Sequence, residues 1–413
     1  MRRIDKEEVR RNLIELRQLT LEVTDDCNLS CRYCGYGEMY EWYDERQSKY
    51  LRFGQIEKLL DFLTGLWNSN ESVSSNPHTF ISFYGGEPLL NMPLIRQVVD
   101  YMEQSPAGRR FRYSMTTNAV CLDKEMDYLV EKGFRLLISI DGDSYANSYR
   151  VRKDGRASFG KVVKNISLLR ERYPDFYERN VSFNSVLHDR NSVGGIRKYL
   201  KETFGKTGTI AELNNSGVRE DKKDLFEKTY RNKQQSLQGS GICKALSKEM
   251  FLEVPAIQSL WSYLRSYSGN FYFRPTDLLK EETEDGRLPT GTCTPFAKKM
   301  FVTVNGKLLP CERINHVFSC GTVSEEGLHL DEAGIAEQYN ACLDKMEHQC
   351  SACALRKGCG QCLYYIEGMQ GESPVCRAFM NAEDFRRYES SCLSCLVGDP
   401  ALYLKLMQEV VVE

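Results

Sequence analysis

Several features that would assign this chain of 413 residues to a broad class are missing. The charge is almost balanced, with 55 Lys and Arg against 57 Asp and Glu, and no basic block favours nucleic acid. Apolar runs are far shorter than the roughly 20 residues of a membrane span, and the first residues lack the apolar stretch of a signal peptide. There is no internal repeat. We therefore expect a cytoplasmic protein with no nucleic-acid or membrane partner.

Cysteine, by contrast, is abundant, with 16 residues. Three lie between Cys27 and Cys34, and most of the others lie between Cys293 and Cys395. Stable disulfides are rare in a reducing compartment, where clustered cysteines more often bind metal. A secreted disulfide scaffold is the alternative, but it requires an oxidising compartment.

The first cluster of cysteines is spaced C-x3-C-x2-C, at Cys27, Cys31 and Cys34. Three thiolates supply only three corners of a cubic iron–sulfur cluster, so one iron lacks a protein ligand. Zinc sites usually combine two separated Cys-x2-Cys pairs. Glu38 is the nearest other ligand, but a hard carboxylate matches a cluster iron poorly. The spacing therefore predicts a cofactor that brings its own chelating group.

Strand-like and helix-like segments alternate in the first half of the chain. The expected strands are Gln18–Thr24, Thr79–Tyr84, Phe111–Thr116, Phe134–Ile140 and Asn180–Leu187. The expected helices are Phe53–Trp67, Met92–Tyr101, Lys124–Lys132, Phe159–Arg172 and Gly194–Thr203. This alternation predicts parallel strands with right-handed crossovers, which form a barrel or part of one. The polar segment Asn68–His78 is expected to form a surface loop. The charged segment Glu212–Gly239 is expected to form a helix-containing excursion or connector.

Four polar or glycine-rich motifs lie at the carboxyl ends of the first four expected strands. They are the cysteine loop, Gly85-Gly86-Glu87-Pro88, Thr116-Thr117-Asn118 and Ser139-Ile140-Asp141-Gly142. Each motif alone is weak, because such sequences often form ordinary turns or helix caps. The carboxyl ends of parallel barrel strands share one mouth, however, so the four motifs together predict a site there.

These motifs resemble those of radical S-adenosylmethionine (SAM) enzymes, and the stretch from Ser139 to Val151 resembles anaerobic sulfatase-maturing enzymes and peptide maturases. The family cleaves SAM reductively to a 5′-deoxyadenosyl radical, and the open iron chelates the methionine part of SAM. The resemblance implies that Cys27, Cys31 and Cys34 ligate this cluster. It also implies a SAM-binding set of Tyr33, Gly85, Gly86, Glu87, Asn118, Ser139 and Arg150. A structural ion pair between Glu87 and Arg150 is the alternative for those two residues.

The second half of the chain resembles a SPASM domain, which houses two auxiliary 4Fe–4S clusters. The resemblance assigns Cys293, Cys311 and Cys362 to the first auxiliary cluster, and to the second Cys350, Cys353, Cys359 and Cys376. A zinc-ribbon-like module is the alternative, because paired Cys-x2-Cys motifs suit zinc equally well.

This chain departs from the SPASM pattern in two places. Only two residues separate Cys359 from Cys362, where the family usually has three, and no cysteine lies in 281–292. The fourth iron of the first auxiliary cluster is therefore either open or completed by Cys320. Cys392 and Cys395 are either a ligand pair or free buried thiols. We expect isolated core cysteines at Cys121, Cys243 and Cys342.

Sulfatase maturases of this type carry an acidic base directly after the second SPASM cysteine. Here Glu312 follows Cys311, so Glu312 is a tentative catalytic base or else a solvated loop charge. Only 26 residues precede Cys27, too few for a leader-binding winged-helix domain. A leader-bearing precursor would then be recognised by the barrel, the 212–239 segment or a separate protein.

The expected fold is α/β, a partial (β/α)6 TIM-like barrel followed by a small cysteine-rich α+β SPASM domain. The boundaries are 1–210 for the radical SAM core, 211–290 for a connector, 291–395 for the SPASM domain and 396–413 for a terminal helix or tail. The expected function is peptide maturation through a thioether or other crosslink, with SAM, three 4Fe–4S clusters and a reductant such as flavodoxin or ferredoxin. The alternatives are a formylglycine-forming sulfatase maturase, an oxidoreductase of a small alcohol and a non-enzymatic zinc-binding interaction protein.

Overall fold

The computed structural model describes residues 1–69, 71–74, 77–105, 109–239, 251, 254–267 and 293–409. The chain divides into two compact units. The barrel unit consists of Lys6–Ser236 and Thr294–Ala336. The cysteine-rich unit consists of Met1–Asp5, Leu237–Cys293 and Glu337–Glu413. The expected boundaries near residues 210 and 291 differ from this division.

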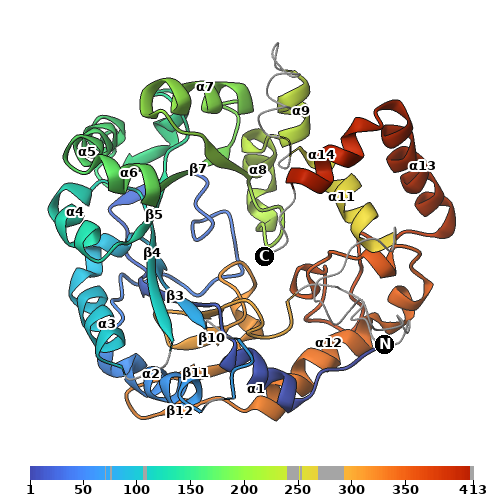
Figure 1. The fold of residues 1–413 in the computed structure, drawn as a ribbon, viewed down its shortest axis with the longest axis horizontal. Coiled ribbons are helices and arrows are strands. Elements are labelled where there is room, and N and C mark those ends of the chain that lie inside the picture. Colours follow the sequence, from blue (N-terminus) through green and yellow to red (C-terminus); the bar gives the residue numbers. More distant parts are fainter. Residues whose placement is uncertain are drawn as a thin grey trace. The chain divides into compact units, whose positions relative to one another are not determined.

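The barrel unit contains six parallel strands that are hydrogen-bonded in chain order. They are β1 (Gln18–Thr24), β3 (His78–Gly85), β4 (Arg110–Thr117), β5 (Arg135–Ser139), β7 (Val181–Leu187) and β8 (Gly208–Glu212). The crossovers carry α2 (Phe53–Trp67), α3 (Met92–Gln104), α4 (Leu122–Glu131), α5 (Phe159–Arg172), α6 (Pro174–Asn180) and α7 (Val193–Phe204). Figure 1 shows helices α3 to α7 outside the curve of these strands. The predicted partial barrel is confirmed.

Three of the predicted elements have the predicted bounds, namely β1, α2 and α5. Strand β8 and helices α6 and α1 (Lys6–Ile14) were not predicted from the sequence. Nor was an antiparallel ribbon of β2 (Leu29–Cys31) and β6 (Arg150–Arg152). Strands this short carry too few alternating residues for a period to be recognised.

The parallel sheet has an apolar outer face and a polar inner face. Side chains alternate between faces along a strand, so residues such as Leu19, Leu21 and Phe83, all fully buried, point outward. Tyr113 on this face donates a hydrogen bond to the Val99 carbonyl in α3 (3.4 Å). The inner face instead carries hydroxyl and amide groups that bond across β1, β3 and β4, namely Gln18, Ser82 and Ser114. The hydrophobic core therefore lies between strands and helices, and the inner face stays polar.

Four further strands continue the sheet beyond β1. They are β9 (Met300–Val302), which is parallel to β1, and the antiparallel strands β10 (Lys307–Leu309), β11 (Gly321–Val323) and β12 (Leu328–His329). Met300, Phe301 and Val302 are fully buried, so pairing covers an edge of β1 that would otherwise offer open hydrogen-bonding groups. Residues 300–329 had been expected in the SPASM domain, but they complete the sheet of the barrel unit.

The cysteine-rich unit is mainly helical where it is described. Its longer helices are α11 (Pro255–Tyr267), α13 (Ala382–Gly398), α14 (Ala401–Glu409) and most of α12 (Glu332–Ala352). Leu260, Leu264, Cys392 and Leu406 form a buried cluster. The connector contains the predicted helical structure, as α8 (Lys223–Thr229) and α9 (Lys233–Gln238), whereas Cys243 lies outside the described residues. Of the helices in the described ranges, none combines the length and the apolar character that crossing a membrane requires.

We predict that Gly306→Ala weakens the extended sheet. Gly306 has φ +79° in the turn between β9 and β10, and a Cβ there would lie 2.0 Å from the Val323 carbonyl oxygen in β11. Backbone strain and overpacking together should lower the free energy of unfolding by about 2–4 kcal/mol. Gly65→Ala in α2 is the matched control, because nothing lies within 4 Å of its added Cβ. That variant should gain about 0.5–1 kcal/mol. Urea unfolding of both variants provides the comparison, and equal stabilities would contradict this account of Gly306.

Candidate functional site

The loop after β1 carries Cys27, Cys31 and Cys34 and is fixed to the loop after β5 by the β2–β6 ribbon. In this ribbon Cys31 pairs with Arg150. The Arg32 amide extends the pairing by donating to the Tyr149 carbonyl (3.2 Å). The position of the three cysteines therefore depends on residues more than 100 positions away in the sequence.

The structure brings the three thiols close together. Burial, with a smaller contribution from the neighbouring Cys34 thiol, raises the pKa of Cys27 and that of Cys31 to about 12. The Cys27 sulfur accepts hydrogen bonds from the Leu29 amide (3.4 Å) and the Asn118 side chain (3.7 Å). With these raised pKa values, Cys27 and Cys31 lose their protons only beside strong positive charge, which cluster irons supply. This donor set fits an iron–sulfur cluster.

A single metal ion fits the described residues less well. Within those ranges, no three His, Cys, Asp or Glu side chains are arranged to hold one ion. An iron–sulfur cube does not need such an arrangement, because each cysteine binds a different iron.

Gly85 and Gly86 bring the loop after β3 against the cysteine loop. A Cβ on Gly85 would lie 2.2 Å from the Thr24 carbonyl oxygen, and one on Gly86 would lie 1.9 Å from that of Asp26. The amides of Gly86 and Glu87 donate to these same two carbonyls, at 2.8 and 2.9 Å. The close packing of the two loops thus explains why both positions are glycine, without any contact with SAM. Their approach to SAM remains a prediction.

Glu87 joins the loops after β3 and β4. Its buried carboxylate accepts hydrogen bonds from the Thr117 hydroxyl (2.6 Å), the Asn118 amide (2.8 Å) and the Leu89 amide (3.2 Å). Burial raises the pKa of Glu87 to about 7 despite these bonds. The Asn118 side chain in turn donates to Asn28 beside Cys27 (2.7 Å). Glu87 therefore positions Asn118, and Asn118 contacts the cysteine loop.

Arg150 forms its ion pair with Asp141 rather than with Glu87. Its Nε and Nη2 donate to the two carboxylate oxygens at 2.9 and 3.0 Å, and the aspartate is fully buried. Burial alone would raise the pKa of Asp141, but the guanidinium and further hydrogen bonds hold it well below its usual value. The predicted alternative, a Glu87–Arg150 pair, is wrong, because each residue is bonded to other partners.

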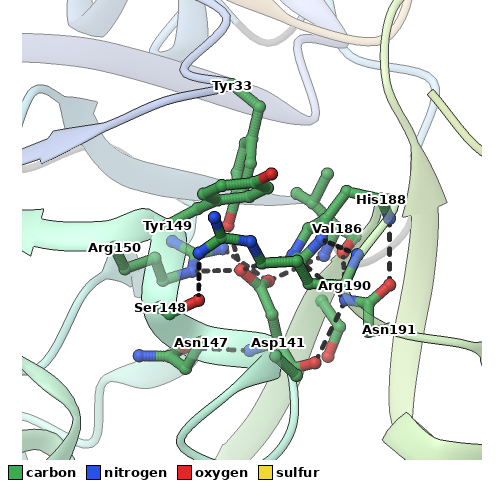
Figure 2. A network of polar contacts seen from close by, with 12 residues as sticks. Tyr33, Asp141, Asn147, Ser148, Tyr149, Arg150, Val186, His188, Arg190 and Asn191 are labelled. Carbon is green, nitrogen blue, oxygen red and sulfur yellow. Dashed lines mark hydrogen bonds and ion pairs between the residues drawn. The ribbon is translucent and has the colours of Figure 1, made fainter. Parts of the chain in front are cut away.

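Asp141 also holds Tyr33, which precedes Cys34. The Tyr33 hydroxyl donates to the carboxylate, and the Val186 amide of β7 donates to it at 2.9 Å. Figure 2 shows these groups converging on Asp141. The Tyr33 ring is buried and stacks on His188, with ring centroids 5.3 Å apart. Whether Tyr33 lies against an adenine remains a prediction.

His188 and Asn191 complete this network from the loop after β7. The Arg190 amide donates to His188 Nδ1 (3.1 Å), so a neutral ring carries its proton on Nε2. Asn191 donates to the carbonyls of Asp141 (3.2 Å) and Val186 (2.9 Å). Neither residue was predicted from the sequence, although both follow the fifth expected strand. Their position after a strand end is the same signal that identified the other four motifs.

Ser139 ends β5 on the inner face, where it is half-buried and pairs in register with Asn184 of β7.

Glu312 is not the solvated charge that sequence analysis allowed as an alternative. Its side chain is 15% exposed, and Lys299 pairs with it at 2.9 Å. Burial would raise the pKa of Glu312, but the Lys299 ammonium holds it below its usual value. Burial, with smaller contributions from charge on Cys311, Glu312 and Cys34, raises the pKa of Tyr43 to about 12. Tyr43 thus lies near both the first cysteine loop and the Cys311–Glu312 motif, all within the barrel unit.

Four thiols converge within the cysteine-rich unit. Burial raises the pKa of Cys350 to about 11, with smaller contributions from three neighbouring thiols, those of Cys359, Cys376 and Cys353. These are the four cysteines predicted for the second auxiliary cluster. For the first auxiliary cluster, Cys362 has the Cys293 thiol nearby in the same unit, whereas Cys311 belongs to the barrel unit.

The remaining described cysteines vary in environment. Cys342 is buried, as predicted, and Cys320, the candidate fourth ligand of the first auxiliary cluster, is buried as well. Cys121 is not an isolated core residue, because its half-buried sulfur accepts a hydrogen bond from Asn28 of the cysteine loop (3.3 Å). Cys392 is buried but Cys395 is exposed, so the prediction of two buried thiols is wrong for Cys395. Its position near the end of α13 leaves it facing solvent.

Comparison with protein families matches residues 21–201 to the Radical SAM superfamily. An uncharacterised protein of Methanocaldococcus jannaschii is 30% identical over 156 residues, which cover 38% of this chain and 49% of that protein. The radical SAM cyclopropyl synthase TigE of Paramaledivibacter caminithermalis is 27% identical over 184 residues (42% and 36%). The serine-type anaerobic sulfatase-maturating enzyme of Bacteroides thetaiotaomicron is 28% identical over 150 residues (35% and 34%). The matches thus span between a third and half of these relatives.

A solved structure shares the fold over nearly the whole chain. It is native anSMEcpe with bound AdoMet and Cp18Cys peptide, with a TM-score of 0.62 and 16% sequence identity. The alignment covers 95% of this chain and 99% of that one.

We predict that Asp141→Asn destabilises the barrel unit, because the buried Arg150 guanidinium loses its counter-charge. The free energy of unfolding at pH 7 should fall by about 3–5 kcal/mol. The folded-state pKa of Asp141 is lowered, so its stabilisation is present above about pH 4 and is lost as the pH falls further. The variant should therefore lose less stability than the parent between pH 4 and pH 2.

Asp175→Asn is the control, since Asp175 forms an exposed pair with Arg179. It should leave the unfolding midpoint unchanged. If Asp141→Asn behaves in the same way in urea titrations at both pH values, Asp141 does not hold the site together.

Proposed function

We propose, for a chain whose residues 21–201 form a radical SAM domain, that the protein modifies a peptide through radical chemistry. The observation that carries the proposal is the placement of Cys27, Cys31 and Cys34. Their loop lies at the carboxyl end of β1, bonded to the loops after β3, β4 and β5. The expected product is a thioether or another crosslink in a ribosomally made peptide.

In this proposal Cys27, Cys31 and Cys34 hold a 4Fe–4S cluster, and SAM binds beside it. When bound, the cluster and SAM would supply a 5′-deoxyadenosyl radical as the acceptor of a substrate hydrogen. Asn118, positioned by Glu87, hydrogen-bonds the Cys27 sulfur, and Asp141 fixes Tyr33 and Arg150. Because Arg150 already uses Nε and Nη2, a contact with the SAM carboxylate would use Nη1. Ser139 and the Gly85-Gly86 backbone complete the proposed SAM site.

We assign Cys350, Cys353, Cys359 and Cys376 to one auxiliary cluster, which the convergence of their thiols supports. A second auxiliary cluster would use Cys293, Cys311 and Cys362, with its fourth iron open or bound by Cys320. An auxiliary cluster can accept the electron left on the substrate after radical closure. Zinc at these cysteines remains the alternative, and the iron and zinc content of anaerobically purified protein distinguishes the two.

A peptide substrate is supported by the names of similar proteins. One relative is a cyclopropyl synthase, others are sulfatase-maturating enzymes, and the solved structure of similar fold contains a peptide. Flavodoxin or ferredoxin would reduce the cluster. Every cysteine that the structure describes is a free thiol, which fits the proposed cytoplasmic location.

The second candidate function is formylglycine formation in a sulfatase, and the environment of Glu312 supports this function as well. A carboxylate beside Cys311 that is shielded from solvent and kept ionised by Lys299 is suited to accept a proton. A crosslinking reaction that consumes a cysteine thiol also releases a proton, so Glu312 serves either function.

We predict that the triple variant Cys27→Ala/Cys31→Ala/Cys34→Ala forms no deoxyadenosine when reconstituted protein meets dithionite and SAM anaerobically. It should lose one cluster's share of iron and keep the visible absorbance of the auxiliary clusters. Cys342→Ala removes a buried thiol outside the site and should stay within about twofold of the parent, as core substitutions act mainly on stability. A parent protein that carries clusters but yields no deoxyadenosine would refute the proposed function.

Glu312→Gln should reduce peptide product by about 100-fold or more while deoxyadenosine formation continues, because only proton removal is lost. Glu325→Gln, at an exposed ion pair with Arg52, is the control. The probe is a cysteine-containing peptide analysed by mass spectrometry after treatment with an aldehyde reagent. Labelled product indicates formylglycine and rejects the crosslink. Product that has lost its cysteine thiol but does not react with the aldehyde reagent supports the crosslink.

A further inference from the structure

The inner face of the barrel-unit sheet carries arginines at the end opposite the cysteine loop. Three arginines lie there in register with inner-face residues of neighbouring strands. Arg110 pairs with His78, Arg112 with Phe80 and Arg135 with Ser114. All three arginines are exposed, and each belongs to the set of residues that alternates with the buried outer face.

The guanidinium groups of Arg112 and Arg135 both lie near the ring of Phe80. The Arg135 guanidinium carbon lies 5.1 Å from the centre of the Phe80 ring, and that of Arg112 lies 6.0 Å from it. In the part of the chain that the structure describes, neither guanidinium has a carboxylate within ion-pair distance. Two like charges over one ring repel each other, and an anion placed between them would relieve this repulsion.

Several exposed arginines elsewhere in the described residues pair with carboxylates, although others do not. Arg156 pairs with Asp154, Arg219 with Asp221, and Arg387 with Glu383. The net charge is close to zero, so acidic partners are available in the sequence. Arg112 and Arg135 thus present donors to solvent on the same polar face that leads to the cysteine loop.

We infer that Arg112 and Arg135 bind an acidic segment of the peptide substrate. This inference rests on the proposed function, which supplies the peptide substrate. The new element is that this peptide is negatively charged. A guanidinium binds a carboxylate through paired N–H groups, and Phe80 beneath the two arginines offers an apolar contact for the adjoining methylene groups.

The strand geometry also sets where the acidic residues lie. From Arg112 to Asn118, which contacts Cys27, β4 and its loop span about six residues, or roughly 20 Å at ~3.3 Å per residue. An extended substrate running along the inner face would therefore carry its Asp or Glu residues about six positions from the residue that is modified.

The test measures peptide binding by the reconstituted holoenzyme, using fluorescence anisotropy. The probes are a fluorescein-labelled peptide that alternates Glu and Gly and its Gln–Gly counterpart. The Glu–Gly peptide should bind more tightly, and salt should weaken its binding. Arg112→Gln/Arg135→Gln should weaken that binding about tenfold, because each lost contact between an arginine and a peptide carboxylate should cost about threefold. Arg112→Lys/Arg135→Lys keeps the charge and should retain most of the affinity.

Arg179→Gln/Arg387→Gln is the matched control, because it removes the same charge from two ion-paired surface sites. It should leave binding within about twofold of the parent, since only distant, screened charge is lost. Equal binding of the two peptides would overturn the inference. So would equal effects of the two Arg→Gln double variants, because binding would then follow net charge alone. Competition by inorganic phosphate as strong as that by the Glu–Gly peptide would show a general anion site and would also overturn it.

Binding of these peptides does not require SAM cleavage, so the outcome is independent of deoxyadenosine formation. A protein that forms deoxyadenosine but shows no arginine-dependent binding keeps its proposed function and loses this inference. Arginine-dependent binding by a protein that forms no deoxyadenosine would establish an acidic-peptide surface without the proposed chemistry.

Discussion

The buried carboxylate of Asp141 is the contact on which the candidate site depends. It accepts two hydrogen bonds from Arg150, one from the Tyr33 hydroxyl and one from the Val186 amide of β7. A charge this deeply buried is tolerated only when it is fully paired. Satisfying Asp141 therefore fixes the cysteine loop, the β6 strand and the start of the loop after β7 relative to one another.

The polar inner face gives the fold its capacity for chemistry. A closed barrel fills its interior with apolar side chains, whereas the inner face here carries Gln18, Ser82 and Ser114, with Arg112 and Arg135 farther from the site. The core lies outside the sheet, so the inner face can bind ligands without loss of hydrophobic packing. One end of this face bears three thiols, and the other end bears positive charge.

The sequence predicted the barrel well because its strands and helices are long enough to show their periods. It did not place residues 300–329, since three-residue strands such as Met300–Val302 have no recognisable period. The same limit hid the pairing of Leu29–Cys31 with Arg150–Arg152. The alternative of an ion pair between Glu87 and Arg150 was wrong for another reason. Charge in a sequence shows which residues can pair, but only the fold decides which partners come within reach.

The sequence by itself limited the metal centre that we propose for the first cysteine loop, because the spacing of three cysteines restricts what a loop can hold. It also determined which strand ends carry polar residues. The tertiary structure decided which side chains meet: Glu87 with Asn118, Asp141 with Arg150 and Tyr33, and Glu312 with Lys299. Spacing along the chain is a local property that a motif records. Contacts between residues far apart arise only when burial of the apolar faces brings the strands together.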